Sequence, residues 1–166
     1  MKRTMTSALF ACIAALCAAS PVTVEWKGTE TVPSALARPF SGFLPDGSFL
    51  FAGGSAFEGG AKSYAKDVFL RGANGAWSKI GELPHPIAEG VCCETPLGLF
   101  CAGGTDGQTA FSEAFVMSCR GEIGLPGFTL STKTLPSLPE PVTMGAAAAD
   151  GSKVYRSEER RVGKGV

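Results

Sequence analysis

Short apolar runs that end in a glycine pair recur along the chain. The segments FAGG at 51–54 and CAGG at 101–104 lie 50 residues apart. The run before each pair is almost continuously apolar, which is typical of strands that are covered on both faces. A tight turn rich in Pro, Asp or Gly precedes each run, at 45–47 and 96–98. This pattern predicts antiparallel strand pairs that repeat with a fixed period.

The order of the expected strands is the same in each repeat. We expect inner strand pairs at 40–43 with 48–52, at 90–93 with 98–102 and from 144 onward, and outer strands at 67–70, 77–80 and 114–117. A Leu-Pro pair closes each repeat, at 83–84 and 138–139. A period near 50 residues with a glycine pair after an apolar strand is typical of kelch-type β-propeller blades. The predicted fold class is therefore all-β, a kelch-type propeller fragment.

The chain divides into six predicted parts. They are a signal peptide at 1–19, an N-terminal closing strand with a linker at 20–36, kelch blades at 37–86 and 87–141, the truncated start of a further blade at 142–155, and a non-native tail at 156–166. The closing strand is expected at 22–27, because Trp26 lies seven residues before Pro33, as Trp77 does before Pro84. A strand that completes a blade from the other chain end closes a propeller without open edges. The chain is thus expected to be the N-terminal fragment of a longer ring.

The two ends of the chain have unusual composition. Lys2 and Arg3 precede a short apolar run at 8–19, which predicts a secretory signal and a periplasmic or secreted location, with no membrane span. One back-translation of RSEERRVGK, which begins at 156, reads as a sequencing adapter. Without both ends, 9 basic and 13 acidic side chains leave a net charge of −4. A mildly acidic body is not expected to bind nucleic acid.

Three segments carry a resemblance to a known family. They are FSGFLPDGSFLFAGGSAFEGG, SYAKDVFLRGANGAWSKIGELPHPIAEGV and LGLFCAGGTDGQTAFSEAFVM. Together they resemble the cyclically permuted mutarotases, relatives of bacterial N-acetylneuraminate epimerase. The resemblance implies a six-bladed propeller that acts on a sugar or sugar acid outside the cytoplasm, with sialic acid as the best-known substrate. No cofactor is expected.

The resemblance also implies a mechanism. Sugar anomers exchange by ring opening, in which a base takes the anomeric proton and an acid protonates the ring oxygen. In the sialate enzymes the pair proposed for this is a Glu and an Arg that follow an N-G-E strand end. That string does not occur in this sequence. The catalytic residues are therefore unknown and expected in a C-terminal blade, so this chain alone is expected to be inactive.

Two other readings remain open. The chain could be a non-catalytic kelch module that binds carbohydrate or protein, because a propeller fold does not decide function. It could also be an assembly fragment with no function of its own.

Three charged residues lie where propeller loops commonly bind ligands. Arg38 precedes the first inner strand, Glu58 lies in the glycine-rich loop after it, and Glu89 precedes the next inner strand. We consider all three as candidates for binding the substrate, with ordinary solvated side chains as the alternative. The glycine pairs could likewise approach a ligand or simply allow a bend.

The histidine and cysteine residues bear on possible metal sites and disulfides. His85 is the only histidine and lies between blades, which disfavours copper-radical oxidases, since these need His and Tyr ligands. No C-x-x-C motif occurs, and no metal site is expected. Cys93 and Cys101 lie symmetrically about Leu97, so a disulfide between them is possible in an oxidising compartment. Buried free thiols are the alternative.

Overall fold

The structure is a computed structural model that describes residues 23–25, 28, 31–72 and 75–157. All regular structure in these residues is β, which confirms the predicted fold class. The strands are β1 (Phe40–Phe43), β2 (Phe49–Glu58), β3 (Ala61–Arg71), β4 (Trp77–Glu82), β5 (Val91–Thr95), β6 (Gly98–Ala102), β7 (Ala114–Arg120), β8 (Thr129–Leu135), β9 (Ala146–Asp150) and β10 (Lys153–Ser157).

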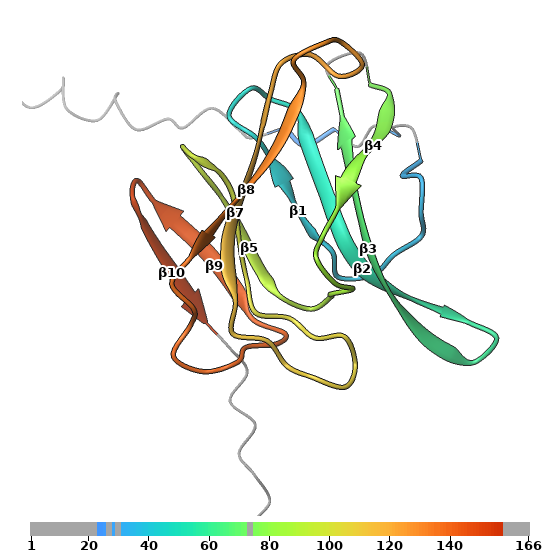
Figure 1. Cartoon of the computed structure of the whole chain (residues 1–166), viewed down its shortest axis with the longest axis vertical. Coiled ribbons are helices and arrows are strands. Elements are labelled where there is room, and N and C mark those ends of the chain that lie inside the picture. Colours follow the sequence, from blue (N-terminus) through green and yellow to red (C-terminus); the bar gives the residue numbers. More distant parts are fainter. Residues whose placement is uncertain (1–22, 26–27, 29–30, 73–74, 158–166) are drawn as a thin grey trace, which may run out of the picture.

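The strands form three antiparallel sheets that lie side by side (Figure 1). The first has the order β1-β2-β3-β4, the second β5-β6-β7-β8, and β9 pairs with β10. We call the two four-stranded sheets blade 1 and blade 2. Each blade is a meander of neighbouring strands, and β1 and β5 are the first strands of their sheets, as the repeat predicts.

Parts of the predicted ends lie outside the described residues. The signal peptide at 1–19 is among them, as is most of the tail, from 158 onward. Of the closing strand predicted at 22–27, the structure describes 23–25, which are not in a strand. The last strand, β10, runs to Ser157, so two residues of the predicted tail pair with β9.

The main core lies between blade 1 and blade 2. Alternate residues of β2, including Leu50 and Ala52, face alternate residues of β6 and β7, including Leu99 and Met117. All four are almost completely buried. Burial of one large apolar side chain contributes about 1.5–3 kcal/mol, so this shared core joins the two blades firmly.

The glycine pairs at the ends of the inner strands contact the segment that leads into the next sheet. Gly53 and Gly103 have φ of 65° and 66°, and a Cβ on them would lie 2.3 Å from the carbonyl oxygens of Ile87 and Val142. The N–H of Gly54 donates to the same Ile87 oxygen at 2.8 Å. Both the positive φ and the close backbone approach require glycine here. The bend interpretation of these pairs therefore has direct structural support.

The structure corrects the proposed cysteine pair. Cys92, not Cys93, is the residue directly opposite Cys101, because the turn between β5 and β6 is centred between 96 and 97. Cys93 lies opposite Phe100, so its side chain and that of Cys101 point to opposite faces of the sheet. The described cysteines are free. Burial raises the pKa of the Cys101 thiol well above its ordinary value, which suits a packed core residue.

Candidate functional site

Three residues with strained backbone stand in register at one end of the sheets. Arg38, Glu89 and Met144 have φ of 52°, 64° and 56°, and each lies two residues before the first strand of its sheet. The N–H of Glu89 donates to the Arg38 oxygen at 3.0 Å, and the N–H of Met144 donates to the Glu89 oxygen at 2.8 Å. Positive φ is uncommon outside glycine, and such strain concentrates at functional sites. We call this end, where β1, β5 and β9 begin, the loop end.

Glu89 is the buried charge of the loop end. Its side chain is only 7% exposed, and its Oε1 accepts a hydrogen bond from Lys62 Nζ at 2.6 Å. Lys62 comes from β3 of blade 1, whereas Glu89 lies two residues before β5 of blade 2. The ion pair therefore links the two blades beside the strained backbone. A charge is buried at low cost only where it is paired and hydrogen-bonded, and Lys62 supplies that partner.

An aromatic ring orients the lysine. Tyr64 lies two residues after Lys62 on the same face of β3, with its ring centroid 5.0 Å from Lys62 Nζ. The hydrogen bond to Glu89, followed by the one to Tyr64, raises the pKa of Lys62 above its ordinary value. The tyrosine ring in turn lies against Gly107, where an added Cβ would come within 2.6 Å of it. The lysine is thus held as an ammonium group between two blades.

The three sequence candidates have different positions. Glu89 is buried and paired, and Arg38 is exposed beside it and joined to it through the backbone. Glu58 lies apart from them, exposed near the tip of the β2–β3 hairpin, which extends beyond its sheet (Figure 1). Sequence reasoning missed Lys62 and Tyr64. Their alternation on one strand was visible, but nothing in the sequence indicated a contact with a residue 27 positions away.

His85 has a connecting role. Its Nε2 lies 2.9 Å from Glu113 Oε1, and its ring packs on Phe111 with centroids 4.4 Å apart. The histidine lies between β4 and β5, and both partners lie in the loop between β6 and β7. These contacts fasten the connection between the blades to the second blade.

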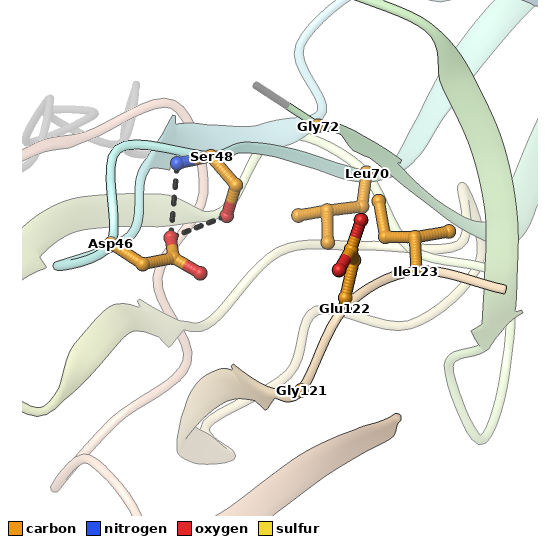
Figure 2. Close-up of a pocket in the computed structure, with 7 residues that line it drawn as sticks. All are labelled: Asp46, Ser48, Leu70, Gly72, Gly121, Glu122 and Ile123. Atoms are coloured by element: carbon orange, nitrogen blue, oxygen red, sulfur yellow. Dashed lines mark hydrogen bonds between the residues drawn. The ribbon is translucent and has the colours of Figure 1, made fainter. Parts of the chain in front are cut away.

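A groove lies at the other end of the sheets, which we call the turn end because the β1–β2, β5–β6 and β9–β10 turns lie there. Its volume is about 460 Å³, and Asp46 lines one side while Glu122 and Ile123 line the other (Figure 2). Asp46 Oδ1 accepts bonds from the N–H and the Oγ–H of Ser48, at 2.9 and 2.6 Å. This carboxylate therefore serves its own turn, and the groove gathers no reactive pair.

Neither a metal-binding cluster nor a membrane-spanning helix occurs in the described part of the chain. Among these residues, no three side chains of His, Cys, Asp and Glu come together as a metal site would require. No helix of the length and hydrophobicity needed to cross a membrane occurs there either.

Comparison with known proteins gives a structural relative. No protein-family model matches the sequence, and no match was found among curated proteins. The chain is similar to the solved structure of YjhT, a β-propeller, with a TM-score of 0.55 and 28% sequence identity. The match covers 68% of this chain and 36% of YjhT, so the chain spans about a third of that propeller. The similarity shows that the described sheets are part of a β-propeller, and it supports, at a coarse level, the mutarotase-like kelch propellers that the sequence resembles.

Proposed function

We propose that this chain is part of an exported sugar mutarotase or epimerase related to N-acetylneuraminate epimerase. The observation that carries the proposal is the similarity to the YjhT propeller, which covers 68% of this chain at 28% sequence identity. The loop end is the site that we assign to the sugar. It combines strained backbone with a cation and a carboxylate from two blades, and such perturbed groups are typical of functional sites.

The residues of the loop end are suited to binding the sugar and not to transferring its protons. Ring opening needs a base at the anomeric hydroxyl and an acid at the ring oxygen. The Glu89 carboxylate is engaged by Lys62 at 2.6 Å, so the pair is suited to holding and orienting a polar ligand. The proton-transferring residues then come from a blade of the complete ring beyond the residues of this chain. Arg38 would contribute a guanidinium for a substrate carboxylate.

The test is NMR of anomer exchange on a panel of sugar acids and neutral hexoses. We expect the complete ring protein to accelerate exchange and the 166-residue chain to leave the spontaneous rate unchanged. Activity of the chain alone would contradict the placement of the acid and base. Inactivity of the complete protein on the whole panel would refute the enzyme proposal.

The second candidate is a carbohydrate- or protein-binding kelch module. The observation that favours it is the same ion pair, because Lys62 and Glu89 form a fixed polar pair that can hold a ligand without transferring a proton. Saturation transfer from the protein to a sugar, without accelerated anomer exchange, would support this function over the first.

A further inference from the structure

Cys92 and Cys101 face each other across the β5–β6 hairpin of blade 2. The hairpin turns between Thr95 and Gly98, and the pair that flanks a two-residue turn is hydrogen-bonded. Hydrogen-bonded and non-hydrogen-bonded pairs alternate from there, so Cys92 and Cys101 form a non-hydrogen-bonded pair. The Cα atoms of such pairs are about 4.5 Å apart, and disulfides span Cα separations of about 4.4–6.8 Å. The backbone therefore already fits a bridge between these two cysteines.

The other two described cysteines have no partner of this kind. Cys93 lies opposite Phe100, on the other face of the sheet. Cys119 lies four residues past Phe115, the residue opposite Cys101, which is roughly 13 Å along an antiparallel strand. The register thus selects one pair among the four described cysteines.

In the reduced form the Cys92 thiol contacts the edge of β1 that faces away from β2. Its S–H donates to the Ser41 carbonyl oxygen at 3.4 Å, and the Ser41 N–H donates to the same sulfur at 3.4 Å. Glu94, on the same face of β5, accepts the N–H of Phe43 at 2.8 Å. Two side chains of blade 2 thus hold the first strand of blade 1. A disulfide removes the S–H donor and turns the sulfur toward β6, so oxidation would act on the contact between the blades.

We propose that Cys92 and Cys101 form a reversible disulfide, and that its formation releases the edge of β1 from Cys92. The oxidant is a small-molecule disulfide such as that of glutathione. The Cys92 thiolate attacks one sulfur of the oxidant, expels the first thiolate and leaves a mixed disulfide on Cys92. Cys101 then loses its proton, and its sulfur attacks Cys92 Sγ and expels the second thiolate. The two cysteines lose two electrons and two protons, and the oxidant becomes two thiols.

Burial sets the order and the rate of these steps. Cys101 is fully buried, whereas Cys92 is partly exposed, so Cys92 meets the oxidant first. Burial also raises the pKa of both thiols, and only a thiolate attacks a disulfide. The exchange is therefore slow at neutral pH and faster at alkaline pH.

The test is peptide mapping of the full-length chain after treatment with glutathione disulfide at alkaline pH. Free thiols are blocked, the chain is unfolded, and a protease that cleaves after Glu separates 90–94 from 95–113. We expect these two peptides to be linked, and the link to be lost on reduction. Cys92→Ser and Cys101→Ser should abolish the link.

Cys93→Ser and Cys119→Ser are the matched controls, and both should keep the link. Cys93→Ser also decides the partner if Cys92→Ser fails to fold, because Cys92 is then the only cysteine in 90–94. Absence of the link from the wild-type chain would overturn the proposal. Loss of the link in Cys93→Ser, or its persistence in Cys92→Ser, would overturn it too.

Hydrogen exchange of the oxidised wild-type chain tests the release of β1. The Ser41 amide should exchange about three- to tenfold faster after oxidation, as for the loss of one hydrogen bond. The Phe43 amide, which Glu94 holds, should be unchanged and is the internal control. Equal Ser41 exchange before and after oxidation would refute the release.

Discussion

The two blades differ most just after their identical glycine pairs. In blade 1 the register shifts between Ala52 and Gly54, and pairing then resumes and continues to the pair Glu58 with Ala61. In blade 2 the strand β6 ends at Ala102, and 103–113 folds into a compact loop. The blade 2 loop is fixed by Asp106, whose Oδ1 accepts the N–H groups of Gln108 and Thr109.

This difference shows how the same repeat can place different segments beside Glu89. The glycine pair fixes where each strand meets the next blade, and the residues after it decide what projects beyond that point. The long hairpin of blade 1 supplies Lys62 and Tyr64, whereas the loop of blade 2 places Gly107 against the Tyr64 ring. The ion pair forms where the hairpin of blade 1 brings Lys62 to Glu89, which precedes the first strand of blade 2.

The largest expected effect comes from filling the space at the blade 1 glycine pair. Gly53→Ala should lower the free energy of unfolding by about 2–4 kcal/mol, because overpacking costs about 1–3 and alanine at positive φ about 1. The matched control is Gly59→Ala, with φ of 58° but no heavy atom within 4 Å of the new Cβ. Chemical denaturation measures both. Equal effects would show that backbone strain, and not the contact with Ile87, requires glycine at 53.

The next effect concerns the ion pair that joins the two blades. Lys62→Met should destabilise the protein by about 1–3 kcal/mol, because it leaves the buried Glu89 carboxylate without its partner. Adding Glu89→Gln should recover part of this loss. A double-mutant cycle measures the coupling, and a value below about 0.5 kcal/mol would mean that the two blades are not linked here.

A smaller, pH-dependent effect is expected in the loop of blade 2. The N–H groups of Thr109 and then Gln108 lower the pKa of Asp106 below its ordinary value of 3.8. The stabilisation is therefore complete above pH 3.8 and is lost as the pH falls through the lower folded-state pKa. Amide chemical shifts of 106–109 should follow this titration. Asp106→Asn keeps an acceptor oxygen and should remove the pH dependence, and a persistent titration in that variant would contradict the assignment.

The smallest effect is expected at the outer edge of blade 1. Lys66 and then Lys79 lower the pKa of the exposed Glu82 from 4.5 to about 2. Its contribution is present above pH 4.5 and declines as the pH falls toward 2. Glu82→Gln should make the melting temperature less dependent on pH between these values, and high salt should have the same effect. Glu140→Gln, an exposed change between blades, is the control.

The sequence alone determined the repeat and its strands. The FAGG and CAGG segments, the tight turns and the apolar runs are local signals, and the strand pairs β1–β2 and β5–β6 lie where those signals predict. The need for glycine at 53 and 103 could also be anticipated, because a bend at a strand end is a local backbone property.

Only the tertiary structure decided which side chain contacts Glu89 and which cysteine lies opposite Cys101. Glu89 was a candidate by position, but its partner Lys62 lies on another blade, and contact between blades follows from packing and not from spacing. A shift of one residue in the turn moved Cys92 opposite Cys101 and sent Cys93 to the other face, since strand side chains alternate with a period of two. The continuation of β2 past its glycine pair depends on pairing with β3 around a bulge, which single-strand signals do not encode.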